Sequence, residues 1–556
     1  MWHRLSGAVV LAMATAALTA PPMVRDEQPA SGPRIDISFA RAARTDAVTG
    51  MVYVAISRAP STASGSSGAS SRDDTRRTPI EQAGPTGVPL FSHYVEGLRP
   101  DTPATIGASD RGHPLVSLRD LPAGEYWMQP FVNVYTRFAR VDGKTVWLHM
   151  DQWEGQNWKR SPGNLYGDPI RVRFGAASTE PIRLTADKVI PPRPLEPDTA
   201  LVKRIRIQSR ILSRWWGHPI FLGATVLLPR DYDAHPTQHY PVNYEHGHFS
   251  TAPPSGFGRG SAFDAFWQAD GTPRFIHVTL QHPSPYYDDS YGVNSENNGP
   301  YGDAIMQELL PAVESRFRVI REPWARMLSG GSTGGWIALA HQIFYPDFYG
   351  GVFASCPDSV DFRYHQIVDI YKDDNAYFID KGWLRVDRPN QRQPDGNIQS
   401  MMKDENRYEL VVGDRSRSGG QWDIWEATYS PAGEDGYPRR LWNKETGVID
   451  KGVAEQWRKY DLRHILETNW RTLGPKLAHK LHVYMGDMDS YYLNNATELL
   501  AEFLRRADNP TFSGEIVFER RAPHCWGPRG AELTKKMVAH IERHAPKGAD
   551  LKGWRY

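Results

Sequence analysis

The chain has 556 residues, of which 40% are hydrophobic and 11% aromatic, enough apolar side chains for two or three domains with cores. Its formal net charge of +1 at pH 7 argues against a nucleic-acid binder held by bulk charge, because such domains are strongly basic. The 48 glycines and 43 prolines indicate a globular protein with many turns.

Residues 1–22 have the layout of a secretory signal peptide. Arg4 supplies a positive charge, an apolar run extends from Leu5 to Leu18, and small residues precede a pair of prolines. The alternative is a buried N-terminal helix. The run is too short to cross a membrane comfortably, and no other stretch of the sequence has the roughly 18 apolar residues that a span needs. We therefore expect a secreted or periplasmic protein without a membrane span.

Residues 33–185 are expected to form an all-β, immunoglobulin-like sandwich domain. Alternating apolar and polar residues, which are typical of half-buried strands, occur in segments 50–58, 114–121 and 124–138. Residues 60–77 contain few apolar side chains, and we expect a disordered loop there.

A proline-rich linker, residues 186–200, precedes a second domain at 201–545, in which strand-like and helix-like segments alternate. That order predicts a mostly parallel sheet with helices on both faces, an α/β fold. Residues 380–475 interrupt the alternation with a polar, aromatic insertion that carries six tryptophans. The insertion is expected either to cover the site as a lid or wall, or to use these tryptophans for a small core of its own.

The segment GGSTG, residues 330–334, fits the pattern G-x-S-x-G between a predicted strand and a predicted helix. In this pattern the serine occupies a sharp, strained turn that only small neighbours tolerate. A phosphate-binding loop would need Gly-Lys-Ser/Thr, and a dinucleotide fold would need G-x-G-x-x-G in its first unit; the sequence has neither. A tight turn without chemistry is the remaining alternative. Ser332 is therefore the candidate nucleophile.

A serine nucleophile needs a histidine base and an acid that orients the base, and this arrangement supplies them in the chain order Ser, acid, His. Asp487 and Asp489 follow a predicted strand, and His524 follows the next one. Since the carboxyl ends of parallel strands meet at one edge of a sheet, all of these side chains are expected near Ser332.

Negative charge on an attacked carbonyl oxygen requires fixed N–H donors. One is expected to be the backbone amide of Thr333, which follows the nucleophile. The other is expected from the loop after an early strand, where Gly247 lets the chain turn and His248 presents its amide. His246 and His248 have two other readings, as metal ligands or as polar loop residues, but further ligands at a suitable spacing are missing.

Five segments, in this order, resemble the putative esterase, or esterase D-like, branch of the α/β-hydrolases. The resemblance covers roughly residues 201–380 and 475–545. The segments are HYPVNYEHG, GPYGDAIMQELLPAVESRFRV, RMLSGGSTGGWIALAHQIFYPDFYGGVFASCPD, VYMGDMDSYYLNNATELLAEFL and PHCWG.

The resemblance implies an α/β-hydrolase fold with Ser332 as nucleophile and His524 as base. It places the acid three residues after the glycine of GDMD, which is Asp489, and leaves Asp487 as the alternative. The chain departs from the family at Thr333, where Met or Leu is common, and in its long insertion. The substrate class therefore does not carry over from the family.

The only two cysteines, Cys356 and Cys525, are both expected near the site, because one ends a strand and the other follows His524. In an oxidising compartment they would form a disulfide that fixes the histidine loop. Two unpaired buried thiols are the alternative.

The expected function is hydrolysis of a carboxylic ester through an acyl-enzyme, on a small-molecule or polysaccharide-linked substrate and without a cofactor or metal. Acyl transfer to a sugar or alcohol, peptide hydrolysis, and an inert protein that binds glycans or a cell surface are the alternatives. The sequence does not indicate an oligomeric state. Aromatic residues near the expected site are the candidate substrate contacts: Tyr286, Tyr287, Tyr291 and Trp336.

Overall fold

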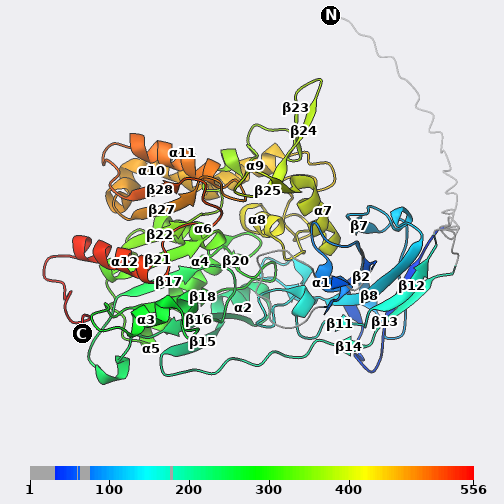
Figure 1. Ribbon diagram of the computed structural model, residues 1–556, viewed down its shortest axis with the longest axis horizontal. Coiled ribbons are helices and arrows are strands. Elements are labelled where there is room, and N and C mark those ends of the chain that lie inside the picture. The colour runs from blue at the N-terminus through cyan, green and yellow to red at the C-terminus, as the bar shows by residue number, and fades with distance from the viewer. Residues whose placement is uncertain (1–31, 59–60, 63–75, 176–179) are drawn as a thin grey trace, which may run out of the picture.

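The computed structural model describes residues 32–58, 61–62, 76–175 and 180–556 (Figure 1). The predicted signal peptide and most of the predicted disordered loop lie outside these residues. In the described part of the chain, no helix combines the length and the apolar character that crossing a membrane requires.

The N-terminal region is rich in strands, as predicted, and its two main sheets share a core (Figure 1). The larger sheet has the order β14-β11-β8-β2-β5-β7, with β12 paired to β8, and the smaller one has the order β13-β1-β6. Its elements are β1 (Ile35–Phe39), β2 (Val48–Ser57), β3 (Ser61–Thr62), β4 (Arg76–Arg77), α1 (Pro79–Gln82), β5 (Leu90–Leu98), β6 (Ala104–Ile106), β7 (Arg111–His113), β8 (Gly124–Val134), β9 (Thr136–Ala139), β10 (Thr145–Leu148), β11 (Leu165–Tyr166), β12 (Ile170–Phe174), β13 (Ile182–Ala186) and β14 (Lys188–Val189).

Strand β2 is buried along its whole length, because both of its faces are covered. Val52 and Val54 point into the core between the two sheets. Tyr53, on the opposite face, packs in a second cluster that also contains Trp158 and Val412. Val412 belongs to the insertion of the second domain, so the sandwich packs directly against that insertion.

The C-terminal domain is built on an eight-stranded sheet of order β15-β16-β18-β17-β21-β22-β27-β28. The six strands from β18 to β28 run parallel, and β15 and β16 form an antiparallel edge. This is the predicted α/β class. The strands are β15 (Val202–Ser209), β16 (Ile220–Leu227), β17 (Val242–His246), β18 (Ile276–Gln281), β21 (Arg326–Gly331), β22 (Gly351–Ser355), β27 (Leu481–Gly486) and β28 (Glu515–Glu519).

Helices flank this sheet, and α6, which follows the glycine cluster, lies against β21 and β22 (Figure 1). The helix α6 is buried over nearly all of its length, as its apolar sequence requires. The remaining elements of this core are α2 (Arg210–Trp216), α3 (Ala262–Gln268), β19 (Asn294–Ser295), β20 (Gly299–Pro300), α4 (Tyr301–Ala304), α5 (Leu310–Arg316), α6 (Thr333–Phe344), α11 (Asn494–Arg506) and α12 (Gly530–His544).

The insertion folds into short strand pairs and helices that extend from α10, beside α11 and α6, to α7, near the N-terminal region (Figure 1). Five of its six tryptophans are buried, and Trp383 is fully exposed. The five buried tryptophans belong to the same core cluster as the residues around the sheet, so they do not form a separate core of the insertion. The elements are β23 (Phe378–Asp380), β24 (Arg385–Asp387), β25 (Pro389–Arg392), β26 (Ile398–Met401), α7 (Met402–Val412), α8 (Gln421–Tyr429), α9 (Lys451–Trp457) and α10 (Leu462–Leu477).

Candidate active site

Ser332 occupies the sharp turn between β21 and α6, with φ 57° and ψ −126°. Residues that have a Cβ rarely adopt a positive φ, so the surrounding structure must hold the backbone of Ser332 in this conformation. A Cβ added to Gly334 would lie 2.0 Å from the carbonyl oxygen of His246, and one on Gly330 would lie 2.2 Å from the oxygen of Gly334. The glycines thus allow β17 and α6 to close tightly around the serine.

Gly334→Ala is expected to destabilise the protein by about 1–3 kcal/mol or more, because the added methyl group overlaps backbone that cannot move aside. Gly331→Ala is the matched control, since its Cβ would meet Cys525 Sγ at 3.4 Å, an ordinary contact. Thermal or urea unfolding of both variants measures the difference. Equal stability of the two variants would contradict this account of the turn.

The structure brings Ser332, His524 and Asp489 together in one hydrogen-bonded row. His524 Nε2 lies 2.9 Å from Ser332 Oγ, and His524 Nδ1 lies 2.6 Å from Asp489 Oδ2. The Asp489 side chain is fully buried, and its other oxygen accepts the backbone amides of Tyr491 and Leu493. Both Asp489 and His524 follow the carboxyl ends of neighbouring parallel strands, β27 and β28, which is why they reach the serine.

Asp487, the alternative acid, has a different partner. Its Oδ1 accepts the backbone amide of Arg521 at 2.5 Å, so it anchors the loop that carries His524. The two aspartates of GDMD therefore have different contacts: Asp489 is hydrogen-bonded to the His524 imidazole, and Asp487 to the backbone of the loop that carries His524.

Thr333 and His248, the two expected amide donors, are positioned differently relative to the serine. Thr333 is the first residue of α6, where a backbone amide has no partner within the helix. His248 lines the same cavity as Ser332. The His248 imidazole donates a hydrogen bond to Asp288 at 3.1 Å. Burial lowers the pKa of His248, but the hydrogen bond and charge of Asp288 and the charge of Asp289 outweigh burial and raise this pKa to about 9.

His246 does not share a site with His248. Its ring is buried against His282 and His341, with Nδ1 3.2 Å from His282 Nε2. Burial, with the charges of the two neighbouring rings, holds the pKa of His246 well below its usual value. The pair is therefore not arranged as two ligands of one ion.

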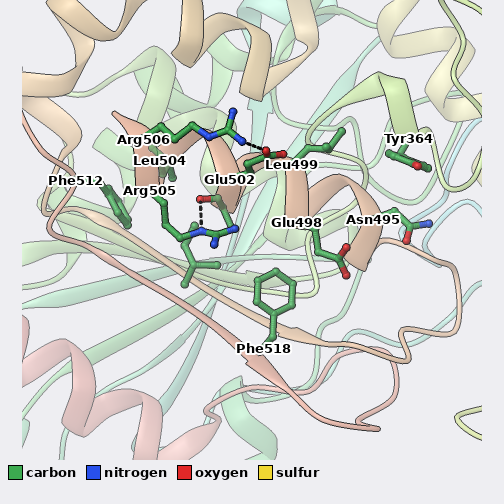
Figure 2. Close-up of a pocket in the computed structure, with 12 residues that line it drawn as sticks. Tyr364, Asn495, Glu498, Leu499, Glu502, Leu504, Arg505, Arg506, Phe512 and Phe518 are labelled. Atoms are coloured by element: carbon green, nitrogen blue, oxygen red, sulfur yellow. Dashed lines mark hydrogen bonds and ion pairs between the residues drawn. The ribbon is translucent and has the colours of Figure 1, made fainter. Parts of the chain in front are cut away.

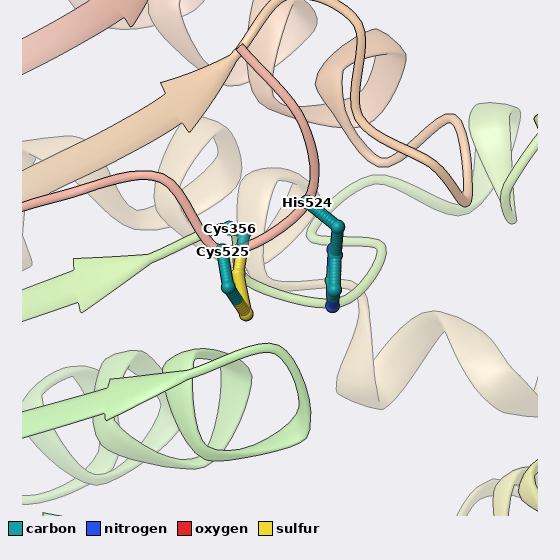
Figure 3. A group of neighbouring side chains, drawn as sticks. All are labelled: Cys356, His524 and Cys525. Atoms are coloured by element: carbon teal, nitrogen blue, oxygen red, sulfur yellow. A yellow bond between two sulfur atoms is a disulfide. The ribbon is translucent and has the colours of Figure 1, made fainter. Parts of the chain in front are cut away.

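Cys356 and Cys525 form a disulfide next to His524 (Figure 3). Cys356 directly follows β22, and its sulfur also lies 3.2 Å from the backbone nitrogen of Ser332. The bond joins positions 169 residues apart in the sequence. It ties the histidine loop to the strand beside the nucleophile, so the expected disulfide is present and adjoins both Ser332 and His524.

A cavity of about 600 Å³ opens over Ser332 and His524. The N-terminal region contributes Pro85 to its wall, so the cavity is shared between the two domains. The insertion also forms part of the wall, in line with the lid-or-wall interpretation. The lining residues that the insertion contributes are Asn390, Glu405, Tyr408, Glu409, Gly420, Gln421, Trp422 and Trp425.

A larger cavity, of about 810 Å³, lies between α11 and the edge strand β28 (Figure 2). Its lining includes Leu499, Arg505 and Phe518, and none of the candidate catalytic side chains borders it. The candidate nucleophile and base border the smaller cavity instead.

The four aromatic candidate contacts divide into two groups. Tyr287 lines the cavity, and its hydroxyl donates to Gln421 at 2.6 Å. Tyr291 is buried behind the wall, where its hydroxyl donates to Asp358. Tyr286 and Trp336 are also buried and lie outside the lining of this cavity, because both point into the core of the domain. Of the four candidates, Tyr287 alone lines this cavity, so Tyr286, Tyr291 and Trp336 are not placed to contact a substrate in it.

Sequence reasoning missed Asp358, whose carboxylate lies 3.4 Å from Ser332 Oγ. A signal was present: Asp358 comes three residues after β22, at the same edge of the sheet as the catalytic candidates. It also missed Gln421 and Trp422, which reach the site only through the packing of α8.

Comparison with known proteins gives a family for part of the chain. Residues 222–440 match the family model described as putative esterase, a range that includes Ser332 and ends before Asp489 and His524. No curated protein matches the chain.

Solved structures of hydrolases resemble the C-terminal domain at low identity. A ferulic acid esterase is 16% identical with a TM-score of 0.34, covering 61% of this chain and 96% of its own. An S-formylglutathione hydrolase from Agrobacterium tumefaciens is 14% identical with a TM-score of 0.35, covering 62% and 97%. A fluorophosphonate-binding serine hydrolase of Staphylococcus aureus is 13% identical with a TM-score of 0.34, covering 62% and 99%. Likeness at this level says nothing about the substrate.

The family match covers the segment that forms the strained turn, and the turn presents a serine at the carboxyl edge of a mostly parallel sheet. Each of these features is what the α/β-hydrolase arrangement requires of its nucleophile. The described part of the chain has the α/β-hydrolase fold, and its residues 222–440 match the family model described as putative esterase.

Proposed function

We propose that this protein is a secreted or periplasmic hydrolase that cleaves carboxylic esters with Ser332, His524 and Asp489. The observation that carries the proposal is the hydrogen-bonded row from Asp489 through His524 to a serine on a strained turn. Export is supported by the layout of residues 1–22 and by the disulfide, which persists in oxidising compartments.

In the first half of the reaction, His524 Nε2 takes the proton of Ser332 as Oγ bonds to the ester carbonyl carbon. The amides of Thr333 and His248 hold the oxyanion, and Asp489 stabilises the imidazolium and keeps Nδ1 protonated. When the carbonyl reforms, the carbon–oxygen bond to the alcohol breaks, and His524 gives its proton to the departing alcohol oxygen. The acyl group remains on Ser332.

In the second half, a water molecule takes the place of the alcohol. His524 removes a proton from this water as its oxygen attacks the acyl carbon. The tetrahedral intermediate then collapses, Ser332 Oγ leaves with the proton from His524, and the carboxylic acid is released. The enzyme returns to its starting protonation state without a metal or redox step.

The N-terminal domain has a role in substrate selection in this proposal. Pro85 borders the cavity over Ser332, and a second cavity of about 400 Å³ is lined by residues 155–159 of the N-terminal region. The two cavities share His248, Tyr287 and three residues of the insertion, so they adjoin. The adjoining cavity gives a larger alcohol or acyl group a place between the domains.

Release of p-nitrophenol from p-nitrophenyl acetate and butyrate tests the proposal. An acyl-enzyme mechanism is expected to give an initial burst of p-nitrophenol close to the enzyme concentration, followed by a slower steady rate. Stopped-flow absorbance measures both phases. Release at the rate of buffer alone, with both esters, would show that the proposed hydrolysis of simple esters is wrong.

A further inference from the structure

A second carboxylate lies beside the nucleophile, and the mechanism above does not use it. Asp358 is buried, with 4% of its surface exposed, and lines the cavity over Ser332. Its Oδ2 accepts hydrogen bonds from Tyr291 and from Thr333 Oγ1, and Trp425 donates in turn to the Tyr291 hydroxyl. This network holds the carboxylate at a fixed position next to the reacting atoms.

The other oxygen of Asp358 lacks a committed donor. In the described part of the chain, its one polar partner is Ser332 Oγ at 3.4 Å. Ser332 has a single hydroxyl proton, and His524 Nε2 at 2.9 Å is the closer acceptor for it. Asp358 Oδ1 is therefore a hydrogen-bond acceptor beside the cavity that a donor group of a substrate could satisfy. Burial raises the pKa of Asp358 and outweighs the opposing effects of the Tyr291 hydrogen bond and of the charges of His524 and His248.

The rest of the cavity also offers acceptors. Glu405 lines it and accepts from Ser400 Oγ, but forms no ion pair within the described residues, and burial raises its pKa. Gln366 and Asn390, each 3% exposed, also line it, and the side-chain oxygen of each is buried without a hydrogen-bond partner.

The charges around this cavity leave it short of cations. No lysine or arginine is among its described lining residues. Of the histidines that line it, His248 is held by Asp288, and its charge also acts on Asp358, while His524 is hydrogen-bonded to Asp489. Trp422 adds an aromatic wall, and aromatic faces attract cations. Buried acceptors, an aromatic wall and a described lining without lysine or arginine favour a positively charged donor.

We propose that this cavity takes esters whose acyl group carries an ammonium group on the carbon next to the carbonyl, with Asp358 Oδ1 as its partner. The inference rests on the proposed function, because it names the substrate class of the same site. An ammonium group supplies three donors and the missing positive charge, whereas a hydroxyl supplies one donor and no charge.

The position of the ammonium group follows from distance. A nitrogen bonded to Oδ1 lies about 3 Å from it, and Oδ1 is 3.4 Å from the Oγ that attacks the carbonyl carbon. An α-amino nitrogen is bonded to the carbon next to that carbonyl carbon, so it can reach Oδ1 while Oγ attacks.

Three ethyl esters of equal size test the inference at pH 6.5, where the amine is largely protonated: those of alanine, lactate and 2-methylpropanoate. After division by their rates of hydroxide hydrolysis, kcat/KM of the wild type is expected to be at least about tenfold higher for the alanine ester than for the other two. Asp358→Asn is expected to lower the ratio of the alanine to the 2-methylpropanoate ester by about 30-fold or more, since it removes one member of a buried charge pair.

Controls separate this effect from general damage to the site. Asp270→Asn removes a carboxylate whose side chain is 96% exposed and is expected to leave the ratio unchanged. Glu405→Gln, on α7 and further from the nucleophile, is expected to lower the same ratio by a smaller factor. It serves as the second variant if Asp358→Asn does not fold.

The outcomes distinguish this inference from the proposed function. Preference of the wild type for the 2-methylpropanoate or lactate ester, or an unchanged ratio in Asp358→Asn, would overturn the amine assignment and leave ester hydrolysis standing. An enzyme that hydrolyses p-nitrophenyl acetate but none of the three ethyl esters would also overturn the amine assignment and leave ester hydrolysis standing. Absence of turnover on every ester would overturn the proposed function and the inference together.

Discussion

Ser332→Ala is expected to lower kcat on p-nitrophenyl acetate by about 10⁴–10⁶-fold and to abolish the burst of p-nitrophenol. Among the described residues, Ser332 has the one hydroxyl that is hydrogen-bonded to His524 Nε2, so in the variant no oxygen attacks the carbonyl carbon and no acyl-enzyme forms. Stability is expected to change little, because the removed Oγ contacts only His524 and Asp358 among the described side chains. Stopped-flow kinetics and thermal unfolding measure the two effects.

Ser315→Ala is the matched control, since Ser315 is an exposed serine near the end of α5. It is expected to keep the wild-type rate and burst. If Ser332→Ala retains more than about a tenth of the wild-type rate with an intact fold, the nucleophile is another residue and the proposed mechanism is wrong.

The parts of the site that sequence alone predicted are those fixed by local backbone rules. The strained turn demands glycine at Gly330 and Gly334, because any Cβ there would overlap the backbone of β17 or α6. That demand leaves a visible motif in the sequence. Likewise, parallel strands bring their carboxyl ends to one edge, so Asp489 and His524 were placed by chain order without any contact being known.

The substrate side of the site was predicted less well, because it depends on packing between distant segments. Trp336 looked like a contact from its place after the motif, but α6 is buried on all sides and turns this ring into the core. Trp422 reaches the cavity because α8 is held over the serine by the fold of the insertion. Pro85 arrives from the other domain. No local pattern encodes these three outcomes.

The same reasoning explains why the disulfide between the two cysteines was predictable from the sequence. It also explains why the residues alone did not decide which aspartate of GDMD is the partner of His524. Cys356 and Cys525 were each adjacent to a placed site residue, so their proximity followed from the topology. Asp487 and Asp489 both follow β27, and only the fold of the loop decides which one turns toward His524.

Asp489→Asn is expected to lower kcat by about 10⁴-fold, as loss of the buried acid does in comparable triads. An asparagine at this position would donate its amide hydrogen to His524 Nδ1, which then has to be the acceptor. The imidazole proton would move to Nε2, the nitrogen that must accept from Ser332. The base would be present at the correct distance but in the wrong tautomer.

Asp487→Asn provides the comparison two residues away in the same loop. Its side-chain oxygen would still accept the amide of Arg521, so the histidine loop keeps its anchor and kcat is expected to fall by less than about tenfold. Steady-state kinetics on p-nitrophenyl acetate, with thermal unfolding of both variants, measures the contrast. If Asp487→Asn is the more damaged enzyme, the acid assignment is reversed. Equal and small losses would mean that His524 works without a carboxylate partner, since the fold gives it no other acid on Nδ1 within the described residues.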